Sequence, residues 1–371
     1  MATREQKRRL SETSGSASKR SKDETADNKP LVLLLAPCDG SLEKKCLEDV
    51  AVVKHNTDVF DDFCQLSDED CANAYAILLG HMGHVTEGLI KKCPKLRVVA
   101  RHGTGVDNVD IDAASKAGVM VCNVPDYGIE EVADTAFSHI LSLYRQTTFL
   151  YEGLRKGQPL GSYDELVSAA GASHRIRGST LGLIGLGNIG MAVAIRAKAF
   201  GFNVRFYDPF LHDGLEKGLG GVLRVHTVEE VITASDCVSI HCPLTKDNRH
   251  VINEKTLKLF KKEAFLVNVS RGGLVDEAAL VKALKEGWIA GAALDVQEKE
   301  PFTFADSILG EAPNLICTPH AAWYSAESMK EAREGACKPV RCAVTNNDPN
   351  GVRNCLNKRQ INMDACQARW K

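Results

Sequence analysis

The sequence predicts an α/β protein of two domains, each built on a sheet of parallel strands, and three observations support this prediction. The chain has 371 residues, 44% of them hydrophobic, which is enough for two separate cores. Short apolar runs alternate with helix-length segments, the spacing typical of parallel β/α units. A glycine-rich turn follows one apolar run and opens a predicted helix, as in doubly wound sheets.

Residues 1–29 are polar and lack aromatic residues, so we expect a disordered basic tail that cannot bury enough surface to fold. Within Lys7–Lys22, the pair Lys7-Arg8 is followed, after ten residues, by Lys19-Arg20-Ser21-Lys22. Two basic clusters at this separation fit a bipartite nuclear-import signal, and a plain solvated tail is the alternative. The pattern predicts a protein of the nucleus that also occurs in the cytoplasm.

Composition excludes several classes of function. The formal net charge of -2 gives no general electrostatic case for nucleic-acid or membrane binding, and no apolar run approaches transmembrane length. Thirteen cysteines without a Cys-x-x-Cys motif or a secretory signal predict reduced thiols in an intracellular protein. His81 and His84 have no further ligand cluster near them in sequence, so no metal site is predicted.

A first, smaller domain is predicted from residue 30 to residue 126. Its expected strands are Leu31–Leu35, Val50–Val53, Ala76–Leu79, Leu96–Ala100 and Val119–Cys122. Arg101-His102-Gly103-Thr104-Gly105 comes directly after one of these strands. Glycines at the end of a strand often form ligand loops in α/β proteins, although an ordinary turn is an equal alternative.

A second domain is predicted over residues 127–331. Glu130–Gly157 has the apolar spacing of one long amphipathic helix. The expected strands are Leu181–Ile184, Asn203–Tyr207, Cys237–Pro243, Ala264–Val269, Ala290–Asp295 and Leu315–Thr318. A last helix, from about Ser325 to Thr345, returns the chain to the first domain, which residues 332–360 complete. Residues 361–371 are polar with little periodicity and are expected to form a C-terminal tail.

The turn after Leu181–Ile184 carries the clearest ligand signal. Its residues fit G-x-G-x-x-G and are Gly185, Leu186, Gly187, Asn188, Ile189 and Gly190. The three glycines permit a tight turn, close approach of a pyrophosphate and packing of helix on strand. Asp208, eighteen residues later, is expected to bind the adenosine ribose hydroxyls and to repel a 2′-phosphate, so NAD is favoured over NADP. Residues after a neighbouring strand are expected to line the same cleft: His241, Cys242 and Pro243.

The predicted fold class is therefore α/β, with two Rossmann-like or flavodoxin-like domains of parallel strands. The nucleotide-binding domain is inserted into a discontinuous substrate domain.

Three residues at successive strand ends suit hydride transfer to a 2-keto acid: Arg271, Glu300 and His320. Strand carboxyl ends meet at one edge of a parallel sheet, so these residues can converge. A histidine can donate the proton that a forming alkoxide needs, and a carboxylate on its other nitrogen fixes the tautomer. An arginine binds a carboxylate and polarises the adjacent carbonyl. Ordinary structural hydrogen bonds are the alternative for each residue alone.

The glycine loop, Asn268–Val275, Gly291–Val296 and Thr318-Pro319-His320 resemble the D-isomer-specific 2-hydroxyacid dehydrogenases. Within that superfamily the chain is most similar to the C-terminal-binding proteins (CtBP), NAD(H)-responsive transcriptional corepressors. The distinguishing stretches are His320–Ser325, Arg175–Gly178, Lys198–Val204 and Asn354–Lys358, and the resemblance covers about residues 30–358.

The resemblance implies particular roles. His320 is the expected acid/base, Glu300 its partner and Arg271 the carboxylate ligand. Asp295 is expected to hold the nicotinamide carboxamide, and Thr104 is expected near the cofactor, as are Arg271 and His320. The substrate side is expected to comprise His81, Arg101, Gly103 and Trp323. The resemblance further implies low turnover, a homodimer that assembles to a tetramer with NAD(H), and recruitment of transcription factors through Pro-x-Asp-Leu-Ser peptides.

Some positions depart from the family pattern. Asn188 occupies a place where the family has arginine, which predicts weaker NADH binding, and Val132 replaces a threonine near the cofactor. The long tail of vertebrate members is not expected after Lys358. The alternative function is a metabolic D-2-hydroxyacid dehydrogenase, such as a glyoxylate or hydroxypyruvate reductase.

Overall fold

The computed structural model describes residues 29–57, 66–346 and 348–370, so the predicted import signal lies outside the described residues. The chain divides into two compact units, which are described separately. The first comprises the residues up to Tyr127 and those from Ala326 onward, and the second comprises Gly128–Ser325.

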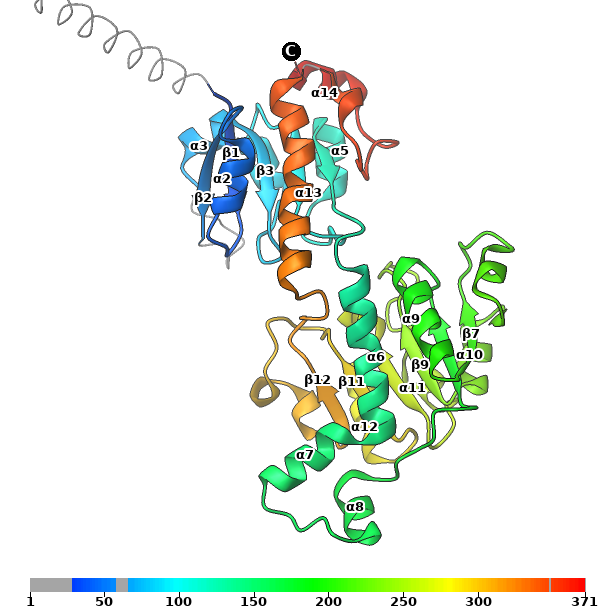
Figure 1. The fold of residues 1–371 in the computed structure, drawn as a ribbon. Helices are drawn as coiled ribbons and strands as arrows, with labels where there is room; N and C mark the ends of the chain where they lie inside the picture. The colour runs from blue at the N-terminus through cyan, green and yellow to red at the C-terminus, as the bar shows by residue number, and fades with distance from the viewer. Residues whose placement is uncertain (1–28, 58–65, 347, 371) are drawn as a thin grey trace, which may run out of the picture. The chain divides into compact units, whose positions relative to one another are not determined.

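The first unit contains a five-stranded parallel sheet, in which β2 and β5 are the edge strands (Figure 1). The strand order is β2-β1-β3-β4-β5, the flavodoxin-like arrangement, so the predicted fold class is confirmed for this unit. The strands are β1 (Leu31–Leu35), β2 (Val52–Asn56), β3 (Ala74–Leu79), β4 (Val98–Arg101) and β5 (Met120–Cys122).

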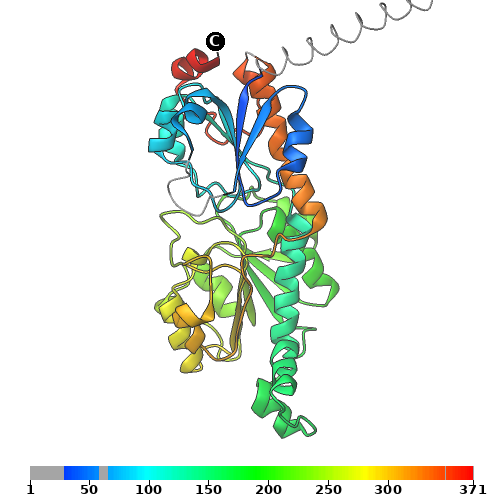
Figure 2. The same ribbon diagram turned by 90° about the vertical axis from the view of Figure 1, so that its left-hand side faces the viewer.

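Helices cover both faces of this sheet (Figure 2). On one face lie α2 (Ser41–Leu47) and α13 (Ala326–Thr345), which pack on alternate buried residues of β1, β3 and β4. On the other face lie α3 (Asp68–Asn73), α4 (Glu87–Lys92) and α5 (Ile111–Ala117). Because both faces are buried, the strands are nearly continuous apolar runs.

The expected C-terminal tail is instead a folded part of this unit. Met363–Trp370 forms α14, and the Trp370 side chain is only 1% exposed. Arg97 donates to the backbone oxygens of Arg369 at 2.9 Å and Trp370 at 3.3 Å, and its guanidinium lies 5.4 Å from the indole centroid. The tail prediction was wrong because Trp370 is an isolated apolar residue whose burial depends on contacts more than 270 positions away in sequence.

The second unit contains a seven-stranded parallel sheet in the order β12-β11-β10-β9-β6-β7-β8. Its strands are β6 (Thr180–Ile184), β7 (Asn203–Tyr207), β8 (Val222–Arg224), β9 (Cys237–Ile240), β10 (Phe265–Asn268), β11 (Gly291–Leu294) and β12 (Leu315–Cys317). The chain order reverses between β6 and β9, the switch point beside which doubly wound sheets bind ligands. The Rossmann-like prediction is therefore confirmed for this unit.

The helices of this unit form a layer on each side of the sheet (Figure 1). One layer contains α6 (Ile129–Arg145) and α9 (Asn188–Ala199), and the other contains α10 (Val228–Ala234), α11 (Glu254–Leu257) and α12 (Glu277–Lys285). Two further helices, α7 (Thr147–Arg155) and α8 (Tyr163–Ala170), pack against each other. Short 3-10 turns are η1 (Leu215–Leu219), η2 (Gly272–Leu274), η3 (Phe304–Asp306) and η4 (Ile308–Glu311), with η5 (Pro349–Gly351) in the first unit.

The predicted single helix over 130–157 is broken at Gln146, which has a left-handed φ of 56°. Its side-chain amide donates to the backbone oxygen of Leu143 at 2.9 Å and so caps the end of α6. A local cap of this kind ends a helix without any interruption of the apolar period, so the sequence pattern could not show it.

Among the described residues, none of the helices combines the length and apolar character needed to cross a bilayer. The same part of the chain contains no group of three or more side chains placed to hold a metal ion. The twelve cysteines within it are free thiols.

Candidate active site

Five loops of the second unit meet at the carboxyl edge of its sheet, because all seven strands are parallel. They follow β6, β9, β10, β11 and β12, and carry the glycine motif, residues 241–243, Arg271, Glu300 and His320 respectively. The predicted cofactor and catalytic residues of this unit therefore share one edge.

The glycine loop has the geometry that a dinucleotide needs. A side chain at Gly185 (φ 95°) would meet the backbone nitrogen of Cys242 at 2.8 Å, and one at Gly190 would meet the oxygen of Gly185 at 2.4 Å. A Cβ at Gly187 would meet no described protein atom within 4 Å, so this side of the loop is open. Gly187 is also the N-cap of α9, whose first turn has no side-chain cap among the described residues. Open space beside an uncapped helix N-terminus suits a pyrophosphate.

Asp208 holds the glycine loop from the end of β7. Its Oδ2 accepts from the backbone N–H of Leu186 at 2.9 Å, and its Oδ1 accepts from that of Phe210 at 2.9 Å. The acid therefore lies directly beside the glycine turn, and its role toward ribose hydroxyls stays a prediction.

His241 lies at the switch point and is uncharged. Burial lowers the pKa of His241 to about 3. Its Nε2 lies 2.9 Å from the hydroxyl oxygen of Ser239, while the following residues Cys242 and Pro243 continue past the glycine loop. A neutral imidazole here adds no positive charge to the cleft.

His320 and Glu300 are hydrogen-bonded to each other, with Nδ1 of His320 2.7 Å from Oε2 of Glu300. The other carboxylate oxygen of Glu300 accepts from the backbone N–H of Gln297 at 3.2 Å. Burial alone acts to raise the pKa of Glu300, but the hydrogen bond and charge of His320, together with the charge of Arg271, outweigh it and lower that pKa. Glu300 thus stays ionised, and Nε2 of His320 is the nitrogen left for a substrate.

Arg271 lies in the loop between β10 and η2. Its Nη1 donates to the backbone oxygen of Ser270 at 2.7 Å, and its own backbone oxygen accepts from the Asn268 amide at 2.8 Å. The Ser270 hydroxyl donates to the backbone oxygen of Cys242 at 2.5 Å, which ties this loop to the switch point. Because the charge of Arg271 acts on Glu300, the structure brings all three predicted catalytic residues into one electrostatic neighbourhood.

Asp295 fixes the turn that carries His320. Its buried carboxylate accepts from the Thr318 hydroxyl at 2.6 Å and from the backbone N–H groups of Ala321 and Ala322, each at 2.9 Å. His320 has a left-handed φ of 52°, and its N–H donates to the backbone oxygen of Asp295 at 2.7 Å. The Trp323 indole N–H donates to the backbone oxygen of His320 at 2.8 Å. These hydrogen bonds fix the main chain of the turn and thereby set the direction of the His320 imidazole.

No structural role was predicted for several polar residues of this framework: Asn268, Gln297, Thr318 and His139. A buried asparagine that ends an apolar strand, as Asn268 does, was the one signal that could have been noticed.

The remaining predicted residues lie in the first unit, at the carboxyl ends of β3 and β4. The Arg101 guanidinium covers Gly103, since a side chain at Gly103 would lie 1.7 Å from Nη1 of Arg101. The Thr104 hydroxyl lies 3.2 Å from the backbone oxygen of Val124. His81 follows β3 and is exposed. These residues and the Arg271–Glu300–His320 set thus belong to different units.

A buried ion pair lies beside Arg101 that the sequence did not predict. Arg333 of α13 donates from Nε and Nη2 to the two oxygens of Glu43, at 2.7 and 2.6 Å, and Glu43 is fully buried. Nε2 of His102 lies 3.6 Å from Oε1 of Glu43, and burial lowers the pKa of His102 to about 4. The pair joins α2 to α13 across 290 positions of sequence.

Fold and site together define the class as a Rossmann-type dinucleotide-binding protein. Comparison with known proteins narrows this class. The family model for the D-isomer specific 2-hydroxyacid dehydrogenase NAD binding domain matches residues 137–322. The chain belongs to this family, and its second unit carries the family's NAD-binding domain.

Individual relatives agree with the family. The chain is 37% identical over 344 residues to C-terminal-binding protein 1 of Caenorhabditis elegans, covering 91% of this chain and 46% of that protein. It thus spans about half the length of that relative, and the expected resemblance to the C-terminal-binding proteins is confirmed. It is 40% identical over 246 residues to a glyoxylate reductase of Korarchaeum cryptofilum, covering 66% of this chain and 72% of the relative.

A solved structure shares the fold over most of its length. The D-lactate dehydrogenase of Aquifex aeolicus, complexed with NAD and lactic acid, superposes with a TM-score of 0.77 at 28% identity. The match covers 88% of this chain and 98% of that enzyme.

Proposed function

We propose that this chain is an NAD(H)-dependent D-2-hydroxyacid dehydrogenase of low turnover that acts as a transcriptional corepressor of the CtBP type. The observation that carries the enzymatic part is the 2.7 Å pair of His320 and Glu300 at the sheet edge that also bears the open glycine loop. The resemblance to C-terminal-binding protein 1 over 91% of this chain supports the corepressor part.

The residues divide the reduction of a 2-keto acid between them. When bound, NADH supplies the hydride. Arg271 binds the substrate carboxylate in a fork and polarises the neighbouring carbonyl. His320 donates the proton from Nε2 to the carbonyl oxygen, while Glu300 at Nδ1 stabilises the protonated imidazole. The product is a 2-hydroxy acid, and in the reverse direction the neutral imidazole accepts the proton.

Removal of the imidazole tests this assignment. His320→Ala is expected to abolish NADH oxidation with a 2-keto acid and to retain NADH binding, because the glycine loop and Asp208 stay intact. NADH oxidation is followed by absorbance and NADH binding by fluorescence. Loss of both NADH oxidation and NADH binding in His320→Ala would contradict the role of His320 as the proton donor.

The corepressor part requires a surface that accepts Pro-x-Asp-Leu-Ser peptides. An extended peptide can add to an exposed sheet edge through its backbone. In the first unit β2 is an edge strand that pairs, among the described strands, with β1 only, and Val52 in β2 is 44% exposed. By contrast, the opposite edge strand β5 is already bridged by the segment around Cys355. The edge of β2 is therefore the favoured place for a peptide.

Peptide binding is measured by fluorescence polarisation of a labelled Pro-x-Asp-Leu-Ser peptide, with and without NADH. Micromolar binding that the matched Asp-Leu→Ala-Ser peptide loses is the expected result, and an NADH effect would demonstrate coupling between the two sites. Absence of binding in both conditions would leave only the dehydrogenase part of the proposal.

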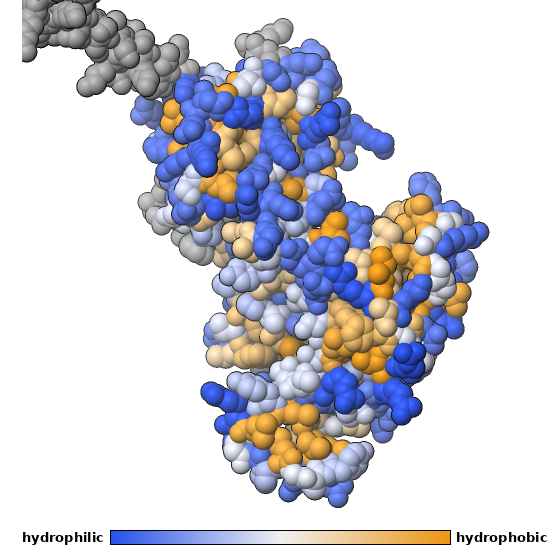
Figure 3. Space-filling model, in the orientation of Figure 1, coloured by the Kyte–Doolittle hydropathy of each residue, from blue (hydrophilic) through white to orange (hydrophobic). Residues whose placement is uncertain are grey.

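A homodimer, extended to a tetramer by NAD(H), is also proposed. The helices α7 and α8 expose an apolar patch in the second unit (Figure 3). Exposed large side chains of these two helices include Tyr151, Leu154 and Tyr163, at 62, 63 and 76%. Large apolar side chains gathered on one surface suit association with a second copy. Sedimentation with and without NADH measures the two assembly states.

The alternative is a metabolic glyoxylate or hydroxypyruvate reductase, which the 40% identity to a glyoxylate reductase favours. The two functions differ in substrate preference and rate. A high kcat on glyoxylate, together with no peptide binding, would favour the metabolic function.

A further inference from the structure

The segment after η5 pairs with the edge strand β5 and brings two cysteines face to face. Cys122 and Cys355 are opposite each other in an antiparallel bridge, and the N–H of Leu356 donates to the backbone oxygen of Val121 at 2.8 Å. The two cysteines thus lie between ladder hydrogen bonds, where opposed Cα atoms are about 4.5 Å apart. This separation falls within the range of about 4.4–6.8 Å that a disulfide spans.

Asn357 holds this pairing in place. It is 1% exposed, and its amide donates to the Ser115 hydroxyl at 3.0 Å and to the backbone oxygen of Val119 at 2.9 Å. Its Oδ1 accepts from the N–H of Val121 at 3.0 Å and from the thiol of Cys355 at 3.2 Å. The hydrogen bonds of the buried Asn357 side chain therefore hold the segment of Cys355 against β5, with Cys355 opposite Cys122.

The two thiols also differ in acidity. The hydrogen bond from Cys122, helped by the backbone N–H groups of Asn357 and Val121, lowers the pKa of Cys355 to about 7 although burial opposes it. The same hydrogen bond and burial raise the pKa of Cys122. Cys355 is thus the more acidic of the two thiols and the one expected to react first with an oxidant.

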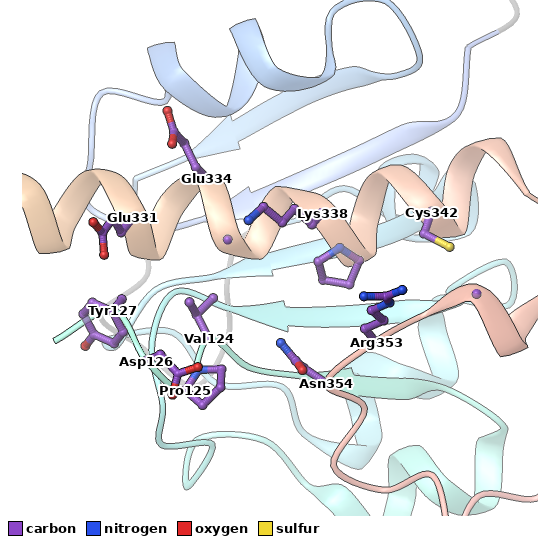
Figure 4. Close-up of a pocket in the computed structure, with 13 residues that line it drawn as sticks. Val124, Pro125, Asp126, Tyr127, Glu331, Glu334, Lys338, Cys342, Arg353 and Asn354 are labelled. Carbon is purple, nitrogen blue, oxygen red and sulfur yellow. The ribbon is translucent and has the colours of Figure 1, made fainter. Parts of the chain in front are cut away.

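Cys355 is the more exposed of the two cysteines. Its side chain is only partly buried, whereas Cys122 is fully buried. A cavity of about 610 Å³ lies between α13 and the residues after η5 (Figure 4); the neighbouring Asn354 lines it, whereas Cys355 does not. Its lining carries charges of both signs: Lys338 and Arg353 are basic, and Asp126, Glu331 and Glu334 are acidic.

We propose that Cys122 and Cys355 form an oxidation site, a dithiol that a peroxide converts to an intrachain disulfide. The Cys355 thiolate attacks one peroxide oxygen, the O–O bond breaks, and the products are a sulfenic acid at Cys355 and hydroxide. The Cys122 sulfur then attacks the sulfenic sulfur, and hydroxide leaves and takes the thiol proton as water. Two thiols are oxidised, one hydrogen peroxide is reduced, and a dithiol reductant reverses the reaction.

The disulfide would tie the segment that carries α14 to the edge of the first sheet. Cys342 is the competing partner, because its sulfur would lie 3.1 Å from a Cβ on Gly351, in the segment that leads to Cys355, and its charge acts on Cys122. Structural thiols that do not react are the other alternative. A single mass-spectrometric experiment separates these three possibilities.

The purified full chain is treated with hydrogen peroxide at pH 7.5, alkylated and digested with trypsin without reduction. Trypsin releases Cys122 in residues 117–145 and Cys355 in residues 354–358, each the one cysteine of its peptide. The expected product is the cross-link of these two peptides, which dithiothreitol removes. Cys355→Ser must lack it, whereas the matched variant Cys342→Ser must retain it at the wild-type yield.

Two results would overturn the proposal. One is a cross-link from Cys355 to Cys342 in place of Cys122. The other is full alkylation of Cys355 without any cross-link at peroxide concentrations that oxidise exposed methionines. Circular dichroism of Cys355→Ser checks that the variant is folded, so that loss of the cross-link reflects the missing sulfur.

Discussion

Gly187 offers a test of the cofactor site that separates folding from binding. Its backbone angles, φ −74° and ψ −165°, are accessible to alanine, and a Cβ there would meet no described protein atom within 4 Å. Gly187→Ala should therefore cost less than about 1 kcal/mol in unfolding free energy, the loss of a favourable N-cap residue. The methyl group would instead occupy the space in which a pyrophosphate approaches the backbone.

The expected loss of affinity follows from the hydrogen bonds that the methyl group disturbs. A hydrogen bond to a charged group contributes about 1.5–3 kcal/mol, and each 1.4 kcal/mol corresponds to about a factor of ten. Loss of one backbone–pyrophosphate bond therefore predicts an NADH dissociation constant raised about tenfold to a hundredfold. Fluorescence titration measures the affinity, and urea unfolding measures the stability.

The matched control is Gly190→Ala, three positions along the same loop. A Cβ at Gly190 would lie 2.4 Å from the backbone oxygen of Gly185, so helix and strand must separate. Overpacking of this kind predicts about 1–3 kcal/mol lost from the unfolding free energy. The reasoning fails if Gly187→Ala binds NADH like the wild type, or if it destabilises the protein as much as Gly190→Ala does.

Three further predictions concern other parts of the molecule. Glu300→Gln should lower kcat about tenfold in NADH oxidation assays, because the hydrogen bond between His320 and a charged, partly exposed carboxylate is lost. The NADH dissociation constant should change less than about twofold. An unchanged kcat would contradict the proposed role of Glu300. Trp370→Ala should lower the free energy of urea unfolding by about 3–5 kcal/mol, whereas a true tail would give no change. Glu43→Gln should destabilise the protein by about 3 kcal/mol at neutral pH. Burial acts to raise the pKa of Glu43, but Arg333 outweighs it and lowers that pKa. The ion pair therefore stabilises the fold fully above the ordinary glutamate pKa, and this stabilisation is lost as the pH falls through the lowered pKa. The difference in unfolding free energy between Glu43→Gln and wild type must shrink in acid, and a difference that stays constant would exclude the ion pair as its cause.

Local pattern was sufficient to predict the fold class and the placement of Arg271, Glu300 and His320 at one edge of a sheet. Parallel strands are buried on both faces and appear as short apolar runs, so most strands were located within two or three residues. The glycine loop was recognisable because a strand, three glycines and a helix follow one another directly. Arg271, Glu300 and His320 could be grouped because parallel topology sends successive strand ends to one edge.

Features that depend on distant contacts or on one local cap could not be predicted. The break at Gln146 leaves the apolar period intact, and α14 is fixed by contacts of Arg97 and Trp370 far apart in sequence. The buried pair of Glu43 and Arg333 has no sequence signature, since each residue alone resembles a solvated charge on a helix.

The residues by which this chain belongs to its family are concentrated in the second unit. The glycine loop, the Asp295-anchored turn and the set Arg271, Glu300 and His320 all lie in that unit, and the family model matches it alone. The edge of β2 and the Cys122–Cys355 pair lie in the other unit. The set proposed for hydride transfer and the strand edge proposed for the peptide are made of different residues. A dehydrogenase site of this geometry is therefore compatible with a corepressor and with a metabolic enzyme, and peptide binding at the edge of β2 is the property that separates the two.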